Sequence, residues 1–567
     1  MKYVLLTFLL CVMLVVNAQE NNEFPQYPSP LRIPVYLSAT FGELRSNAFH
    51  AGVDIKTGGV EGKEVFAVAD GYVSRVSVSP YGYGKAIYVT HNDGFMSVYA
   101  HLQCFNDEIG EYVREKQYET QSFRQNIILK ENEIVIKKGD YLGRSGNSGS
   151  SGGPHLHYEL RYTKTEEPVN PLFFGLKVKD DIKPVLSSLA VYPLNDALVN
   201  GRDTVCFFDV MKKNGKLSLK NDVIAAQGAI AFGISAFDRA NDTPNKNGVY
   251  SIELFADDEL LFSFYADSYS YDETRYINSL TDYSHYIKNK VYYVRTERDP
   301  FNILRMSSEK NGSIYVEEGD MINMHLVVKD YHGNASILDF VVKGSEYEKV
   351  KPKPQPDRSY YRVFDGCEMT VSLDGFNAEI PEKCFYRDEY IKAKQIDSIG
   401  DIVSDYAYLI GSEYIPVHKY IKLRLRPKKD YVGNKNLYVV KIDKTGKFIP
   451  CGGVMRNEEM QCSVNSLGIY ALSVDTVAPT LRLINFGEKW DVSKHTSLYM
   501  EIIDKESGIK SYNMYVNDHW VLTDYDAKKD FLSYKIDEYT KKGTNKIKIV
   551  ITDNVGNETV TELTVLR

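Results

Sequence analysis

The sequence of 567 residues lacks the features of several large functional classes. Its net charge of −8 is mild and spread along the chain without a basic stripe, which argues against a nucleic acid partner. No two of its seven cysteines have C-x-x-C spacing, so no cysteine zinc site is indicated. After the first residues, no stretch is apolar enough to cross a membrane.

The one long apolar run lies at the N-terminus. Residues 1–18 start with a basic residue, continue through the apolar Val4–Val16 and end at Ala18, which predicts a cleaved secretory signal peptide. About 13 apolar residues are fewer than the roughly 20 that span a bilayer. Leu10 precedes Cys11 where a lipid anchor would need a small residue, so we discount lipidation. We expect a secreted chain, periplasmic or extracellular, without a transmembrane segment in its mature form.

Export permits disulfides among the cysteines that remain after Cys11. Six cysteines allow fifteen pairings, and spacing does not choose among them. Four of them fall close together in the chain, and we expect pairing within that group: Cys367, Cys384, Cys451 and Cys462.

The most informative stretch is a histidine-containing strand, Gly152–Leu160. Side chains alternate between the two faces of a strand, so His155 and His157 face one side while Leu156, Tyr158 and Leu160 face the other. A neutral imidazole is a common zinc ligand, so this strand offers half of a metal site.

Two further segments supply candidate partners. His50 and Asp54 form an H-x-x-x-D, and His101 follows apolar residues at the end of a predicted strand. Each histidine alone is more often a satisfied core residue. Together, an H-x-x-x-D and an H-x-H provide three protein ligands and leave a fourth position for water, as in catalytic zinc sites. Spacing does not decide whether His155 or His157 is the ligand.

Seven landmarks occur in an order and spacing that resemble the lysostaphin/LytM-type zinc endopeptidases of peptidoglycan. The resemblance covers residues 31–176. Besides His50–Asp54, Tyr99–Leu102 and the H-x-H strand, the landmarks are Phe41–Arg45, Ala69–Val73, Tyr81–Gly84 and Gly139–Gly143.

The resemblance implies a site and a mechanism. His50, Asp54 and His157 would bind Zn²⁺, and His155 and His101 would act beside the metal as catalytic groups. These two would take the proton of the attacking water and stabilise the oxyanion. The implied reaction is hydrolysis of peptide bonds in peptidoglycan stem peptides or cross-links, and the sequence does not identify the bond.

Other segments of this domain carry smaller expectations. Asn92–Gly94 predicts a tight hairpin that delivers His101, with His91 facing solvent. The glycine-rich Gly143–Gly153 lacks a G-K-[ST] ending and leads into a strand, so it is not a phosphate loop, and its glycines are expected to let the backbone approach a bound peptide. Arg45 and Asn147–Ser151 are candidate substrate contacts. Residues Glu108–Ile127 predict a partly helical segment, either a lid or a solvated excursion.

The predicted fold is mainly β throughout. An antiparallel LytM-like peptidase domain is followed by several β-sandwich, immunoglobulin-like domains with short strands and regular turns. The boundaries are expected as follows: 1–18 signal peptide, 19–30 flexible leader, 31–176 peptidase, 177–346 sandwich, 347–356 proline-rich linker, 357–476 β-rich domain and 477–567 sandwich.

A D-x-x-G-N turn occurs in two of these modules, at Asp330–Asn334 and Asp553–Asn557. One carboxylate per turn is far short of the six to eight oxygens of a calcium site, so turn chemistry explains the motif better. His332 and the other C-terminal histidines lack metal spacing and are expected to be ordinary surface or core residues.

Three functions fit these observations. The leading hypothesis is a secreted zinc endopeptidase acting on peptidoglycan. The main rival is an inactive or latent LytM-like regulator of cell-wall hydrolysis. The third is a surface glycan-binding or adhesion protein, in which the C-terminal β domains dock the chain to the wall or another surface.

Overall fold

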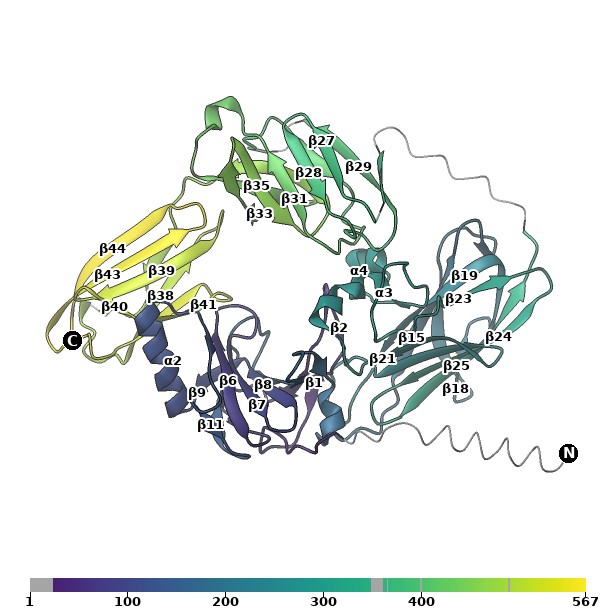
Figure 1. Cartoon of the computed structure of the whole chain (residues 1–567), viewed down its shortest axis with the longest axis horizontal. Helices are drawn as coiled ribbons and strands as arrows, with labels where there is room; N and C mark the ends of the chain where they lie inside the picture. Colours follow the sequence, from purple (N-terminus) through teal and green to yellow (C-terminus); the bar gives the residue numbers. More distant parts are fainter. Residues whose placement is uncertain (1–23, 348–359, 365, 398–399, 488–489) are drawn as a thin grey trace.

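The computed structural model describes residues 24–347, 360–364, 366–397, 400–487 and 490–567. The predicted signal peptide and nearly all of the predicted linker lie outside the described residues. The fold is mainly β, as the sequence predicts, and four β-rich units follow one another around a closed ring (Figure 1). Within the described part of the chain, no helix is both long and apolar enough to span a membrane.

The first unit is built on one antiparallel sheet in the order β1-β4-β13-β8-β7-β6-β10, with β14 beside β13 and β11 beside β6. Its strands are β1 Leu37–Ala39, β4 Val53–Lys56, β6 Gly71–Val78, β7 Lys85–His91, β8 Phe95–Ala100, β10 Gln125–Ile128, β11 Val135–Ile136, β13 His155–Tyr162 and β14 Pro168–Val169. A smaller sheet and a hairpin complete it: β5 Glu64–Phe66, β12 Tyr141–Ser145 and β9 Leu102–Phe105, then β2 Leu44–Arg45 and β3 Ala48–Phe49. The central strand β13 therefore lies between β4 and β8.

The hairpin of β7 and β8 forms at the expected turn, where Gly94 has a φ of +91°. The expectation that His91 faces solvent is wrong. His91 is buried, and both of its ring nitrogens have partners: one lies 3.0 Å from the Asp70 carbonyl and the other 2.8 Å from the Ser97 hydroxyl. The described part of the predicted flexible leader is also packed: Tyr27 is buried, and its hydroxyl donates to Asp93.

The segment Glu108–Ile127 contains helix α2, Asp107–Thr120, followed by β10. Asn106 caps the helix by accepting from the Ile109 amide. Ile109 and Val113 face the core of the first unit. The opposite face contacts the last unit, where Arg114 pairs with Glu538 at 2.7 Å and the Tyr118 hydroxyl bonds Asp537. The predicted helix is therefore present. It joins the first and last units, a role that neither of the two expectations included.

The second unit is an eleven-stranded sheet curled so that β19 pairs with both β15 and β25. Its strands are β15 Val185–Pro193, β16 Leu198–Val199, β17 Cys206–Lys213, β18 Lys216–Leu219, β19 Val223–Phe237, β20 Ser251–Ala256, β21 Glu259–Tyr265, β22 Val294–Arg295, β23 Ser313–Val316, β24 Met321–Lys329 and β25 Ala335–Gly344. Its helices are η2 Tyr271–Tyr276, α3 Ile277–Leu280 and α4 Tyr283–Asn289. The 3-10 helix η1 Pro171–Phe174 precedes this unit and belongs to the first.

The third and fourth units are each built from two sheets. The third contains β26 Tyr360–Val363, β27 Met369–Leu373, β28 Phe376–Ile380, β29 Glu389–Ile396, β30 Ala407–Ile410, β31 Ile421–Leu425, η3 Lys429–Tyr431, β32 Leu437–Ile442, β33 Phe448–Gly452, β34 Val454–Arg456, β35 Glu459–Val464 and β36 Gly468–Val474. The fourth contains β37 Thr480–Leu483, β38 Ser497–Ile503, β39 Ile509–Val516, β40 His519–Val521, β41 Thr523–Asp526, β42 Phe531–Lys535, β43 Thr544–Asp553 and β44 Glu558–Leu566. In the fourth unit, both four-stranded sheets contribute to one apolar core.

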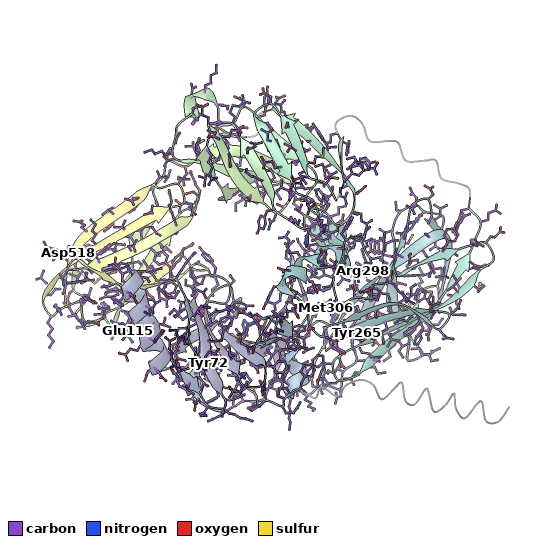
Figure 2. The ribbon with its side chains drawn as sticks, in the orientation of Figure 1. Tyr72, Glu115, Tyr265, Arg298, Met306 and Asp518 are labelled. Atoms are coloured by element: carbon purple, nitrogen blue, oxygen red, sulfur yellow. The ribbon has the colours of Figure 1, made fainter. Side chains whose placement is uncertain are left out.

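The seam between the first two units is tightly packed. Phe41 and Phe49 of the first unit belong to the apolar core of the second. Gly42 has a φ of +72°, and a Cβ there would lie 2.8 Å from Ala266 Cβ and 3.1 Å from Cε of Met306, which Figure 2 labels. The segment that carries His50 is therefore held by the second unit as well as by its own sheet.

The expected disulfides are not formed. None of the six cysteines in the described residues is joined to another. Cys384 and Cys462 are buried in the core of the third unit, where a thiol packs as a small apolar group.

Candidate metal and catalytic site

The three predicted metal ligands meet at one point of the first unit. His157 on β13 is in register with Asp54 on β4. Asp54 Oδ1 lies 2.8 Å from His157 Nδ1 and 3.1 Å from His50 Nε2, and the two nitrogens are 3.0 Å apart. All three side chains are buried.

Neighbouring groups set which ring nitrogens face this point. His50 Nδ1 lies 2.8 Å from the Thr40 carbonyl, and His157 Nε2 lies 2.8 Å from Glu159 Oε1. A carbonyl and a carboxylate only accept, so each of these nitrogens carries a proton and donates it. The other ring nitrogens, His50 Nε2 and His157 Nδ1, then direct their lone pairs toward Asp54 Oδ1. Three acceptor atoms this close together repel one another unless a proton or a cation lies between them.

The donor set fits zinc. Two atoms bound at 2.0–2.2 Å to a tetrahedral zinc are roughly 3.3–3.6 Å apart, so the observed separations of 2.8, 3.0 and 3.1 Å would have to widen by a few tenths of an ångström. Two imidazoles and one carboxylate are ligands that zinc accepts, and the carbonyl and carboxylate behind the imidazoles orient them as outer partners of a metal site do.

The electrostatics of the cluster favour a positive charge. Burial would raise the pKa of Asp54, but His50 and hydrogen bonds from the surrounding imidazoles hold that pKa well below its usual range. Burial lowers the pKa of His50. Burial would also lower the pKa of His157, but its hydrogen bonds to Asp54 and Glu159 raise that pKa to about 9. Without a metal, the proton on His157 supplies the charge.

The two predicted catalytic histidines lie beside this cluster. His155 Nε2 is 3.5 Å from Asp54 Oδ1, and its Nδ1 is 2.8 Å from the Gly153 carbonyl. His101 Nδ1 is 2.9 Å from the Ser148 carbonyl, and the His101 ring centroid is 4.9 Å from that of His155. The carbonyls hold a proton on each Nδ1, so each Nε2 is the acceptor. Burial, with His157 and His155 nearby, lowers the pKa of His101 to about 3, so its ring is neutral.

Backbone geometry supports these positions. His101 has a φ of +58°, a left-handed conformation that is uncommon outside glycine and clusters at functional sites. Gly52 lies directly against β13: a Cβ at this position would be 2.3 Å from the Tyr158 carbonyl oxygen. Only glycine allows β4 to approach β13 closely enough to bring Asp54 opposite His157.

The sequence argument missed the groups behind His157. Glu159 is completely buried, and Arg161 pairs with it at 2.6 Å. Burial would raise the pKa of Glu159, but Arg161 and the His157 hydrogen bond lower it to about 2. Tyr83 donates to Glu159 at 2.5 Å, and Tyr271 of the second unit does so at 3.2 Å. Strand alternation continued beyond His157 would have identified Glu159 and Arg161, because both face the same side.

The candidate substrate contacts have partners within the chain. Arg45 Nη2 lies 2.9 Å from Asp54 Oδ2. This guanidinium therefore pairs with one carboxylate oxygen, while the other, Oδ1, faces the imidazoles of His50 and His157. In the glycine-rich loop, a Cβ at Gly149 would lie 2.3 Å from the Gly84 amide nitrogen, whereas Gly152 and Gly153 have open space around them. The glycine at 149 is therefore needed for the chain's own packing, and only 152 and 153 leave room for another molecule.

The last unit contacts the same loop. Lys528 donates to the carbonyl oxygens of Asn147 and Gly149, the latter at 2.8 Å. Lys85 at the start of β7 pairs with Asp524 at 2.6 Å. These contacts close the ring of four units next to the candidate site.

Comparisons with known proteins match two parts of the chain to families. Residues 48–123 match Peptidase family M23, and residues 366–475 match the Zu5-like domain. The chain is 31% identical over 133 residues to the DD-carboxypeptidase/endopeptidase Mpg of Neisseria meningitidis, covering 24% of each chain. It is 34% identical over 133 residues to the murein hydrolase activator NlpD of Escherichia coli, covering 24% of this chain and 27% of that one. The chain thus spans about a quarter of the length of these relatives.

Two similar solved structures each cover about a quarter of the chain. The catalytic domain of the M23 protein EnpA from Enterococcus faecalis is 25% identical, with a TM-score of 0.20, and covers 27% of this chain and 98% of that one. The catalytic domain of lysostaphin from Staphylococcus simulans is 24% identical, with a TM-score of 0.19, and covers 25% of this chain and 91% of that one. The match of residues 48–123 to Peptidase family M23 confirms the lysostaphin/LytM-type resemblance predicted for this part of the chain.

Proposed function

We propose that the chain is a zinc endopeptidase of the cell envelope that hydrolyses peptide bonds in peptidoglycan. The observation that carries the proposal is the convergence of His50 Nε2, Asp54 Oδ1 and His157 Nδ1, with two further imidazoles alongside. When bound there, zinc supplies Lewis-acid activation of a water molecule and of the scissile carbonyl. One relative is named a peptidase and another a murein hydrolase activator, which supports peptidoglycan as the substrate class.

The roles of the protein groups follow from their hydrogen bonds. His155, with its proton on Nδ1, presents Nε2 as the acceptor for the proton of the attacking water. His101 holds its own proton on Nδ1 through the Ser148 carbonyl and lies on the same side, where its neutral Nε2 is a second acceptor for the proton of the attacking water. Glu159 orients His157, and the Thr40 carbonyl orients His50.

A regulator that binds metal without cleaving is the second candidate. The similarity to a murein hydrolase activator favours it, as does the contact of Lys528 with the loop beside the site. On either hypothesis, secretion follows from the N-terminal apolar run, and the C-terminal β-rich units would serve for docking to the wall. An adhesive role would rest on those units alone.

One experiment separates these functions. The zinc-loaded chain is incubated with purified peptidoglycan, and the soluble fragments are identified by mass spectrometry, with His50→Ala as the inactive form and His519→Ala as the matched control. Release of peptide fragments that requires His50 supports the peptidase. Stoichiometric zinc without release, together with stimulation of an added murein hydrolase, would replace it with the regulator.

A further inference from the structure

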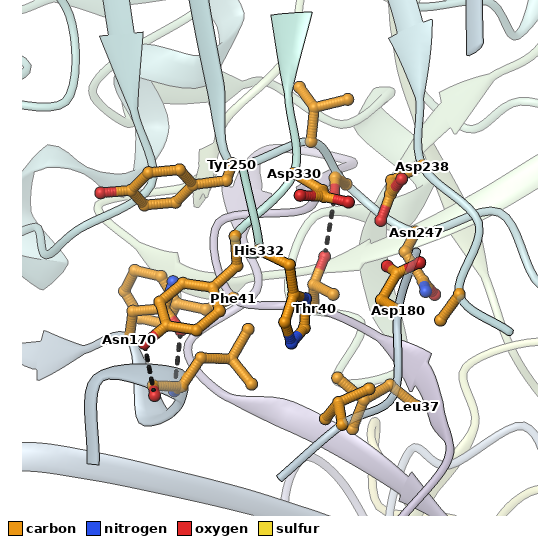
Figure 3. A pocket seen from close by; sticks show the side chains of 16 residues that line it. Leu37, Thr40, Phe41, Asn170, Asp180, Asp238, Asn247, Tyr250, Asp330 and His332 are labelled. Carbon is orange, nitrogen blue, oxygen red and sulfur yellow. Dashed lines mark hydrogen bonds between the residues drawn. The ribbon is translucent and has the colours of Figure 1, made fainter. Parts of the chain in front are cut away.

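A second polar cluster lies at the seam between the first two units. Asp180, Asp330 and His332 each place a potential ligand atom within 4.8 Å of the others. Asp238 and Asn247 line the same cavity, which holds about 30 Å³ of free space (Figure 3). That space accommodates a water molecule or a bare ion.

Two oxygen atoms in this cavity have no partner. Asp238 is 4% exposed and Asn247 is 3% exposed, yet Oδ1 of each side chain is buried without a hydrogen bond. Figure 3 shows the Asp238 carboxylate directed toward those of Asp180 and Asp330. A buried acceptor without a partner is costly, so an unpaired carboxylate oxygen beside an unpaired amide oxygen indicates a missing donor or cation.

Among the described residues, no lysine or arginine forms an ion pair with Asp180, Asp238 or Asp330, and the basic side chain of this cluster is His332. Burial, with Asp180 and Asp330 adding negative charge, raises the pKa of Asp238 to about 7. The cluster therefore carries excess negative charge whenever Asp238 ionises.

The same arrangement recurs in the fourth unit. Asp475, Asp504 and Asp553 place carboxylate oxygens within 4.8 Å of one another. The aspartates correspond in pairs. Asp180 and Asp475 each begin a D-x-x-x-P segment, and Asp238 and Asp504 each follow a strand. Asp330 and Asp553 each begin a D-x-x-G-N turn.

The supporting hydrogen bonds also recur. The Asn334 amide donates to the Asp180 carbonyl at 3.2 Å, and the Asn557 amide donates to the Asp475 carbonyl at 3.0 Å. In each D-x-x-G-N turn the asparagine side chain bonds the aspartate at 2.7 Å. A turn supplies one carboxylate, as the sequence argument held, and the fold adds two more from distant segments.

We propose that Asp180, Asp238 and Asp330, with the amide oxygen of Asn247, bind a calcium ion, and that Asp475, Asp504 and Asp553 bind a second one. Carboxylate and amide oxygens with added water satisfy the six to eight oxygens that calcium takes. Zinc is disfavoured because the only nitrogen donor, His332, is exposed and its counterpart in the fourth unit is Val555.

The first of these sites is adjacent to the segment that holds His50. Thr40 donates through Oγ1 to the Gly248 carbonyl at 3.1 Å, and its own carbonyl accepts from His50. Gly248 follows Asn247 directly. Calcium would therefore stabilise the seam against which the metal-binding segment packs, without contacting the reacting atoms.

The test uses the full chain, stripped with a chelator, reloaded with one equivalent of zinc and titrated with CaCl₂ by calorimetry. We expect two calcium ions per chain, one in Asp238→Asn, one in Asp504→Asn and none in the double variant. Asp518→Asn, the same change at an exposed turn, should bind two. Calcium should raise the thermal midpoint of the wild type. The rise should be smaller in Asp238→Asn, because that variant lacks the site at the seam.

Folding failure is separated from loss of the site by measuring the variants without calcium. There Asp238→Asn should be at least as stable as the wild type, because it removes a buried charge. Absence of binding at millimolar calcium, or unchanged stoichiometry in both single variants, would overturn the proposal. So would tight zinc binding at this cluster that His332→Ala abolishes.

Discussion

His157 lies directly opposite Asp54 in the antiparallel pairing of β13 with β4, and its Nδ1 is 2.8 Å from the Asp54 carboxylate. Strand pairing alone thus brings together two predicted ligands separated by about a hundred residues. His50, held by Thr40 and by the second unit, completes the set. Each part of this arrangement can be tested separately.

Removal of the neighbouring imidazole should separate metal binding from catalysis. His155→Ala is expected to retain zinc, because His155 is not among the three converging ligands, and to lose roughly 10²–10⁴-fold in rate if it is the general base. Zinc content and peptidoglycan release are measured on the same sample. Full activity would exclude this role, and loss of zinc would make His155 a ligand instead.

Glu159→Gln should weaken zinc binding without changing any of the three predicted ligands. The amide can still bond His157 but no longer carries the charge that faces Arg161 and the imidazole. We expect zinc affinity to fall by about 10–100-fold, as for other partners of metal ligands. A chelator competition assay measures it, with Glu111→Gln on the exposed face of α2 as the control. Equal affinities in both variants would show that Glu159 does not tune the site.

Zinc affinity should depend steeply on pH. Hydrogen bonds to Asp54 and Glu159 raise the pKa of His157 to about 9, so below that pH zinc must displace a proton from it. Affinity is therefore expected to increase about tenfold per pH unit between pH 7 and 9. Titrations in buffers of different ionisation enthalpy count the released protons. A flat profile over this interval would rule out a protonated His157 in the metal-free site.

The glycine between the two ligand strands should not be replaceable. In Gly52→Ala the new methyl would lie 2.3 Å from the Tyr158 carbonyl oxygen, so β4 must move away from β13. We expect a loss of about 1–3 kcal/mol in unfolding free energy, with weaker zinc binding. Gly152→Ala, where nothing lies within 4 Å of the new atom, is the control and should be nearly neutral. Chemical denaturation with zinc titration measures both effects.

Lys528 should restrain the loop beside the site. Lys528→Ala removes its hydrogen bonds to the Asn147 and Gly149 carbonyls. Amide hydrogen exchange in residues 147–151 is expected to become faster, while global stability changes by less than about 1 kcal/mol. Lys529→Ala alters the neighbouring lysine, whose pair is Asp526, and should leave this exchange unchanged. If both variants behave alike, the last unit does not restrain the loop.

Period-two alternation and ligand chemistry sufficed to predict a mainly β fold, a hairpin ending at His101 and one functional face on the H-x-H strand. They could not identify the ligand between His155 and His157, because both face the same side. The family resemblance implied His157, and the pairing register, which brings Asp54 opposite His157, supports that prediction. Local patterns also failed for His91, for Tyr27 and for the cysteines, because their burial depends on segments far away in the chain.

Sequence by itself determined the five candidate side chains, their chemistry and the resemblance to a peptidase family, since those follow from residue types and short spacings. Only the tertiary structure decided which nitrogens carry protons, that Glu159 and Thr40 stand behind the imidazoles, and that three aspartates meet at Asp238. The physical reason is that lone-pair direction and electrostatic compensation depend on atoms a few ångströms apart in space. Those atoms belong to strands that only folding brings together.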